Sequence, residues 1–166
     1  MNATSYPNMD EERELWAQGY LRVAGIDEVG RGPLAGPVMA AAIVLPRDYN
    51  ASWTKRVKDS KLLTPSLRIQ LAFYLEAIAL GVGIGEASHQ EIDTLGILPA
   101  THLSMVRAIK NLRPRPDFLL VDAIHLTDAG APCKAIVHGD ATCFSIASAS
   151  IVAKVTRDRL TREVPA

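Results

Sequence analysis

The chain has 166 residues, 48% of them hydrophobic and 22% charged, which predicts one globular domain and excludes a largely disordered protein. Its 18 lysines and arginines balance its 18 aspartates and glutamates, so the net charge gives no sign of a nucleic-acid binder. Cys133 and Cys143 lack zinc-site spacing and residues 1–20 lack a secretory signal; with no bilayer-spanning stretch, this predicts a reduced, cytoplasmic protein away from the membrane.

Hydrophobic periodicity and turn residues divide the chain into short strands and helices. In chain order they predict a helix at 9–18, strands at 21–29 and 38–45, a helix from Thr64, a strand at 82–87, a helix from Leu98, strands at 117–124 and 134–137, and a helix at 145–160. Strands that come first and then alternate with helices predict an α/β fold with a mixed sheet flanked by helices. We expect a helical extension over 1–20 and a single domain over 21–166.

Local signals set the expected ends of these helices. Thr64 and Pro65 supply a capping side chain and a proline at the first helical position, and Gly81 is expected to close that helix. The helix from Leu98 is expected to end at Arg113, because the residue before a proline disfavours helix. The last helix is rich in alanine and serine, which allow a helix to lie close to a neighbouring sheet.

Acidic residues stand at or just beyond the ends of three apolar segments: Asp27 and Glu28, Asp122, and Asp140. Because sites in α/β sheets form at the carboxyl ends of strands, these acids are placed to converge. Glu28 joins Asp27 only if it lies where its strand ends, because successive strand residues face opposite sides. Two other interpretations stay open at this point, Asp140 as a cap of the last helix and Asp122 as a residue of a surface turn.

Convergence of the four acids would demand a metal ion. Two carboxylates about 4 Å apart repel by about 4 kcal/mol at an effective dielectric of about 20. Hard divalent cations, above all Mg²⁺ and Mn²⁺, relieve such repulsion and prefer oxygen ligands. A pair of ions about 4 Å apart activates a water on one side of a phosphate and stabilises the leaving oxygen on the other.

Two short segments each allow two interpretations. The glycines of Gly30-Arg31-Gly32 let backbone approach a ligand and its arginine suits phosphate, but the tripeptide is equally typical of an ordinary turn. Asp59-Ser60-Lys61 by itself is a loop with a lysine.

Longer motifs follow one another in order along the chain. They are Gly25-Ile26-Asp27-Glu28-Val29-Gly30-Arg31-Gly32-Pro33-Leu34-Ala35-Gly36-Pro37-Val38, Asp59-Ser60-Lys61-Leu62-Leu63, Glu91-Ile92-Asp93, Ile97-Leu98-Pro99-Ala100-Thr101, Leu120-Val121-Asp122, Gly139-Asp140, and Ser145-Ile146-Ala147-Ser148-Ala149-Ser150-Ile151-Val152-Ala153-Lys154-Val155-Thr156-Arg157-Asp158-Arg159. Together they resemble the type 2 ribonucleases H, specifically ribonuclease HII. The first and last motifs are long and specific, and the resemblance covers the chain from Leu21 to Arg159.

The resemblance implies an RNase H-like fold and a metal-dependent endoribonuclease that cuts RNA paired with or joined to DNA. It implies Asp27, Glu28, Asp122 and Asp140 as acids that hold Mg²⁺ or Mn²⁺. It further implies that Gly30, Arg31 and Gly32 follow the minor groove at a ribonucleotide–deoxyribonucleotide junction, where the 2′-hydroxyl distinguishes RNA from DNA. Lys61, Ser148 and Ser150 are expected to contact the nucleic-acid backbone, and family habit predicts a monomer.

Two departures from the family pattern leave alternatives. His138 stands where the family more often has lysine, and the chain stops at Ala166, where relatives continue with a tyrosine-containing segment that packs on the junction sugar. We expect a C-terminally short form, and its activity and junction preference stay open at this point. The alternatives are a catalytically impaired hybrid-binding module, a ribonuclease HIII-type enzyme, and a structural α/β domain with incidental acids.

Overall fold

The computed structural model describes residues 6–32 and 36–163, the last of these by its backbone alone. Residues 1–5, Pro33-Leu34-Ala35 of the first motif, and 164–166 lie outside the described residues. The strands are β1 (Val23–Val29), β2 (Val38–Val44), β3 (Gly81–Ala87), β4 (Phe118–Asp122) and β5 (Cys133–Ile136). The helices are α1 (Asp10–Ala17), α2 (Pro65–Ile78), α3 (His89–Leu95), α4 (Ile97–Lys110), α5 (Gly139–Thr142) and α6 (Phe144–Glu163), with 3-10 turns η1 (Ser52–Arg56) and η2 (Ser60–Leu62).

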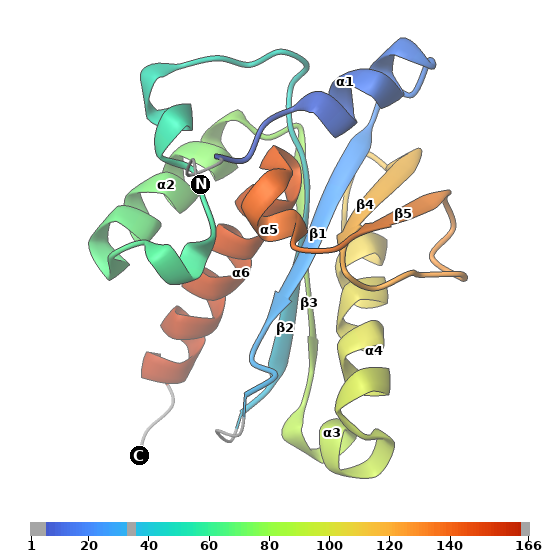
Figure 1. Cartoon of the computed structure of the whole chain (residues 1–166). Helices are drawn as coiled ribbons and strands as arrows, with labels where there is room; N and C mark the ends of the chain where they lie inside the picture. Colours follow the sequence, from blue (N-terminus) through green and yellow to red (C-terminus); the bar gives the residue numbers. More distant parts are fainter. Residues whose placement is uncertain (1–5, 33–35, 164–166) are drawn as a thin grey trace.

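The strands form one mixed sheet in the order β3-β2-β1-β4-β5. β1, β2 and β3 pair antiparallel, whereas β4 lies parallel to both β1 and β5. Figure 1 shows α6 and α2 on one face of this sheet and α4 on the other. The α/β fold with a mixed sheet flanked by helices is therefore confirmed, and all five predicted strands are present with shifts of one to a few residues at their ends.

The last helix lies unusually close to the central strand. A side chain at Gly25 of β1 would place its Cβ 2.2 Å from the carbonyl carbon of Ser145 in α6. Ala147, Ala149 and Ala153 of α6 are fully buried on this side of the sheet. The prediction that small residues let this helix approach the sheet is confirmed, and glycine on β1 is the other half of that close contact.

The second helix ends earlier than predicted. Thr64 caps it as expected, since its hydroxyl accepts a hydrogen bond from the Leu67 N–H. Gly81 does not close it, however, because α2 ends at Ile78 with Ala79 extended, and Gly81 begins β3. Glycine is needed at position 81 for packing, since a Cβ there would lie 2.2 Å from the Arg113 carbonyl oxygen.

The region before Leu98 also differs from the prediction. Ser88 and Glu91 form a reciprocal capping box that starts α3, a helix that the apolar periodicity did not predict. α4 ends at Lys110 rather than at Arg113, with Asn111 as its cap. In the described part of the chain no helix is long and apolar enough to cross a bilayer.

The described part of the N-terminal extension packs against the rest of the chain. Met9, Leu15 and Trp16 are buried in the same hydrophobic cluster as Val23 of β1 and Ile43 of β2. Figure 1 shows α1 lying across the start of β1. The described residues before β1 are thus packed against the sheet, next to the face that α5 and α6 cover.

Candidate active site

Two of the predicted acids stand on neighbouring parallel strands. The register pairs Ile26 of β1 with Val121 of β4, so Asp27 and Asp122 follow directly on adjacent strands. Ile26 and Val121 both belong to the hydrophobic cluster beneath α4. Because successive strand residues face opposite sides, Asp27 and Asp122 both point toward the face that α6 covers.

Asp140 reaches the same place from α5, the short helix between β5 and α6. The Gly139 N–H donates to Oδ1 of Asp122 over 2.8 Å, which holds the first turn of α5 against the end of β4. One carboxylate oxygen from each of Asp27, Asp122 and Asp140 lies within 4.8 Å of the others. Asp140 therefore does not cap α6, and Asp122 is not a free residue of a surface turn.

Glu28 lies beside this three-acid cluster but outside the 4.8 Å group. It is the last residue but one of β1, and its N–H donates to Oδ1 of Asp27 over 2.8 Å. Its carboxylate lies 3.6 Å from the guanidinium of Arg31. It lines the same pocket of about 420 Å³ as the other three acids, so strand alternation does not separate it from them at this strand end.

Burial and neighbouring charges raise the pKa of Asp27, Glu28 and Asp140. Burial raises the pKa of Asp27 well above its ordinary value, and the charges of Glu28 and Asp122 raise it further. The pKa of Asp140 is raised by burial first and then by Asp122 and Asp59. Burial also raises the pKa of Glu28, which Asp27 and Arg31 partly offset. Such a set of oxygen ligands is suited to a hard divalent cation, which would relieve the repulsion.

A protein cation already reaches this cluster. The ammonium of Lys61 lies 3.7 Å from Oδ2 of Asp140 and 3.6 Å from Oδ2 of Asp59. The charges of Asp59, Asp140 and Asp27 raise the pKa of Lys61. The position of this lysine shows that the cluster attracts positive charge, and its side chain remains 75% exposed.

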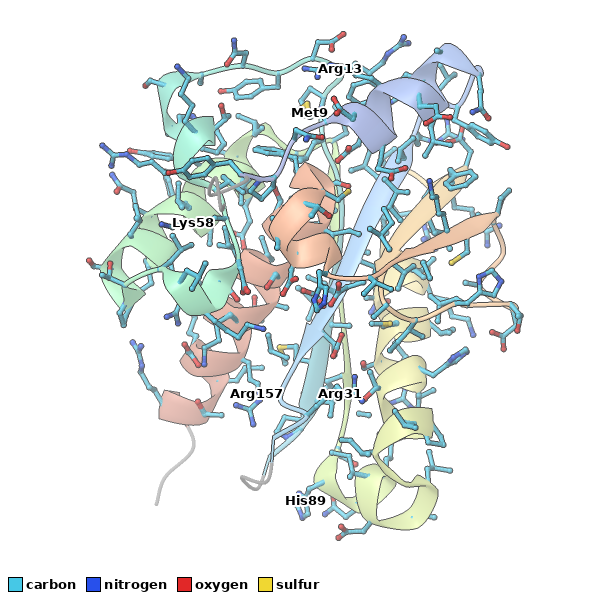
Figure 2. All side chains as sticks on the ribbon, viewed as in Figure 1. Met9, Arg13, Arg31, Lys58, His89 and Arg157 are labelled. Carbon is cyan, nitrogen blue, oxygen red and sulfur yellow. The ribbon has the colours of Figure 1, made fainter. Side chains whose placement is uncertain are left out.

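The Gly30-Arg31-Gly32 loop is held by a residue that the sequence did not single out. Gly30 has a φ of +97°, and a Cβ there would lie 2.6 Å from Nε of Arg157 and from the Pro37 carbonyl oxygen. The same Nε donates to that carbonyl over 3.0 Å. Figure 2 shows Arg31 and Arg157 near the same end of the sheet, opposite to Met9 and Arg13. α6 therefore supports the loop from beneath.

The two serines of α6 differ in what they contact. Ser150 lines the pocket, and its hydroxyl lies 2.8 Å from that of Ser60 in η2. Ser148 is fully buried and its hydroxyl donates to the Phe144 carbonyl of its own helix over 2.8 Å. This burial argues against the expected contact of Ser148 with nucleic acid. The resemblance implied both serines, but of the two only Ser150 lines the pocket.

Sequence reasoning missed three polar residues of the site, Asp59, Lys154 and Arg157. Asp59 accepts from the Lys61 N–H and caps η2, so the Asp59-Ser60-Lys61 segment already held that signal. Lys154 lines the pocket and pairs with Asp158 over 2.9 Å. Arg157 stands in the last motif, but no local pattern predicted its contact with Pro37, which spans 120 residues.

Comparison with known proteins identifies the family. The ribonuclease HII family model matches residues 24–165. The ribonuclease HII of Dehalococcoides mccartyi is 50% identical over 166 residues, which is the whole of this chain and 79% of that protein.

Solved structures support the same assignment. The ribonuclease H2 of Pyrococcus horikoshii is 31% identical with a TM-score of 0.72, over 86% of this chain and 75% of that one, and shares its RNase H-like fold. The Mn²⁺ complex of Bst-RNase HIII is 20% identical with a TM-score of 0.62, over 87% of this chain and 55% of that one, which shows a common fold alone. The family model thus decides between the two related types, and the chain belongs to the ribonuclease HII family of metal-dependent endoribonucleases.

Proposed function

We propose that this protein hydrolyses the RNA strand of RNA/DNA hybrids and cuts on the 5′ side of single ribonucleotides embedded in duplex DNA. The observation that carries the proposal is the meeting of Asp27, Asp122 and Asp140 within 4.8 Å at the edge of an RNase H-like sheet. Membership of the ribonuclease HII family supports the substrate class. The cut leaves a 3′-hydroxyl and a 5′-phosphate.

In this proposal Asp27, Asp122 and Asp140 hold Mg²⁺ or Mn²⁺, and Glu28 completes the set from the edge of the pocket. Two such ions, held by these acids during the reaction, would supply an activated water and would stabilise the leaving oxygen. Asp27 is only 3% exposed, so its charge acts with little screening by water. Asp122 is oriented by the Gly139 N–H, which leaves its second oxygen for the ions.

Substrate recognition falls to the residues around the acids. Gly30 and Gly32 allow backbone to approach the minor groove, and Arg31, 41% exposed in its side chain, supplies a charge for phosphate. The shallow minor groove of an A-like hybrid presents the 2′-hydroxyl that distinguishes RNA from DNA. Lys61 and Ser150 line the same pocket and are proposed to contact the backbone. Ser148 is left out because it is fully buried.

The decisive experiment is a cleavage assay on Asp27→Asn. A duplex with one embedded ribonucleotide and an RNA/DNA hybrid are incubated with wild type or variant in Mg²⁺, Mn²⁺ or Ca²⁺. We expect wild type to cut in Mg²⁺ or Mn²⁺ and the variant to lose cutting in both while it still binds the duplex in Ca²⁺. Asp93→Asn, on the exposed side of α3, is the matched control and is expected to cut like wild type.

Two results separate the alternatives. Full cleavage by Asp27→Asn would contradict the metal mechanism. Wild-type protein that binds the duplex but cuts with neither metal would favour a binding module instead. A monomer in the cytoplasm, with a catalytic domain over 21–166 behind a helical extension over 1–20, completes the proposal.

A further inference from the structure

A buried carboxylate on the N-terminal helix reaches the start of the last helix. Glu12 of α1 is only 3% exposed, and its Oε2 accepts a hydrogen bond from the Ser145 N–H over 2.8 Å. Among the described residues its buried Oε1 has no hydrogen-bond partner, and burial raises the pKa of Glu12. Ser145 is the second residue of α6, where helical N–H groups lack partners within the helix. Glu12 therefore caps α6 from a position 133 residues away in sequence.

The backbone of Asn8 forms two hydrogen bonds to the same junction. The Asn8 N–H donates to the Thr142 carbonyl over 3.1 Å, and the Phe144 N–H donates to the Asn8 carbonyl over 2.9 Å. Asn8 and Glu12 together thus fix the chain from Thr142 to Ser145, which joins α5 to α6. Figure 1 shows the chain that enters α1 passing beside α5.

This junction bears directly on one acid of the cluster. α5 is a single turn of four residues, Gly139–Thr142, and it carries Asp140. A helix this short has no stability of its own, because nucleation costs more than one turn returns. Its first residue is tied to Asp122 through the Gly139 N–H, so its other end depends on the contacts of Asn8 and Glu12.

Glutamate is a costly residue at the buried position 12. A buried carboxylate with one unpartnered oxygen is costly, and a helix can be capped by a local serine or asparagine. The positive end of α6 offsets part of that cost for a carboxylate. What Glu12 adds beyond a local cap is a fixed distance between α1, which is anchored in the core, and the chain that follows Asp140.

We propose that Glu12 is a positioning residue that holds Asp140 at the three-acid cluster through the α5–α6 junction. The inference rests on the proposed function in one respect, namely that Asp140 is a metal ligand. Loss of the Glu12 contact would let α5 shift by tilting about its Gly139 end, and would weaken metal binding before it abolished folding.

The test measures Mn²⁺ binding by isothermal titration calorimetry on the full chain without nucleic acid. Glu12→Ala is expected to raise the dissociation constant for Mn²⁺ about 10-fold. This is the lower end of the effect seen when residues that hydrogen-bond to metal ligands are replaced. Glu12→Gln keeps an oxygen that accepts from the Ser145 N–H and is expected to bind Mn²⁺ like wild type. Glu12→Asp keeps the charge but is one methylene too short, and is expected to behave like Glu12→Ala.

A matched control separates positioning from loss of stability. Leu15→Ala removes core packing on the same helix, and its unfolding midpoint is compared with those of the Glu12 variants. We expect Leu15→Ala to lose as much stability as Glu12→Ala and yet to bind Mn²⁺ like wild type. Equal Mn²⁺ affinity in Leu15→Ala and Glu12→Ala would overturn the positioning role. If Glu12→Ala does not fold, Glu12→Asp takes its place in this comparison.

Asp140→Asn distinguishes this inference from the proposed function. Weak Mn²⁺ binding by Asp140→Asn together with normal binding by every Glu12 variant would refute the role of Glu12 alone. Unchanged Mn²⁺ binding by Asp140→Asn would refute the metal site itself, and the inference with it.

Discussion

The side-chain nitrogen of Lys61 lies 3.7 Å from Oδ2 of Asp140. A metal ion bound to this carboxylate would compete with the lysine for it. Asp59 holds the same nitrogen from the other side at 3.6 Å. Lys61 thus stabilises the acids when no metal is bound, and its exposed side chain is free to turn toward phosphate.

Replacement of Lys61 by glutamine separates these two roles. We expect Lys61→Gln to bind Mn²⁺ as tightly as wild type or up to about 5-fold more tightly, because an exposed ion pair contributes up to about 1 kcal/mol. The same variant is expected to show a higher KM for the hybrid. Calorimetry and steady-state kinetics measure the two effects, with exposed Lys55→Gln as control. Weaker Mn²⁺ binding in Lys61→Gln would contradict this competition.

Ser60 and Ser150 are each only 3% exposed, and the contact between their hydroxyls joins the turn that carries Lys61 to α6. Ser150→Ala leaves the Ser60 hydroxyl buried without this partner, so we expect a loss of about 1–3 kcal/mol in the free energy of unfolding. The double variant Ser60→Ala/Ser150→Ala should lose less than the sum of the single variants. Urea unfolding of the four proteins completes the cycle. Strict additivity would show that the contact stabilises nothing.

Arg157 supports the Gly30-Arg31-Gly32 loop through its hydrogen bond to Pro37. We expect Arg157→Met to raise the KM for the hybrid about 10-fold with a smaller change in kcat, since a hydrogen bond from a charged group contributes about 1.5–3 kcal/mol. Arg159→Met, on the exposed side of the same helix, serves as control. If kcat falls and KM does not change, Arg157 acts on the acids rather than on the loop.

Gly25 lets α6 lie against β1. A Cβ at this position would meet the backbone of Ser145 at 2.2 Å, which no side-chain rotation relieves. We therefore expect Gly25→Ala to reduce the free energy of unfolding by about 3 kcal/mol. Gly32→Ala, where a Cβ meets no atom of the described residues within 4 Å, should leave stability unchanged and is the control in a thermal or urea melt. Equal stability of both variants would show that α6 moves away from β1 without cost.

The ion pair of Glu91 and Arg107 gives a pH-dependent contribution to stability. Hydrogen bonds from Arg107 lower the pKa of Glu91 from 4.5 to about 2. Because the folded pKa lies below the unfolded one, the contribution is complete above pH 4.5 and is lost as the pH falls toward 2. The Tm difference between wild type and Glu91→Gln should therefore shrink from about pH 6 to about pH 3. A difference that stays constant across this range would contradict the lowered pKa.

Local patterns in the sequence were enough to predict the strands and helix ends that are set by residues close together in the chain. Apolar runs bounded by turn residues predicted all five strands, and Thr64 with Pro65 predicted the start of α2, because a cap and a fixed φ act within one turn. The ordered motifs added the family and the set of acids. Ser88 and Glu91 could have predicted α3 in the same way, since their capping box is a signal of four residues.

Contacts between distant segments decided the rest. Gly81 carries the same local signal as a helix-ending glycine, yet its role is to leave room for the Arg113 carbonyl across the fold. Ser148 and Ser150 stand in one motif, but the sheet buries the first and leaves the second on the pocket. The sequence by itself thus determined which acids exist and that they stand at or just beyond the ends of apolar segments. Only the tertiary structure decided that Asp27, Asp122 and Asp140 meet. Parallel pairing of β1 with β4 joins Asp27 to Asp122, 95 positions apart, and the Gly139 N–H holds α5 with Asp140 against Asp122.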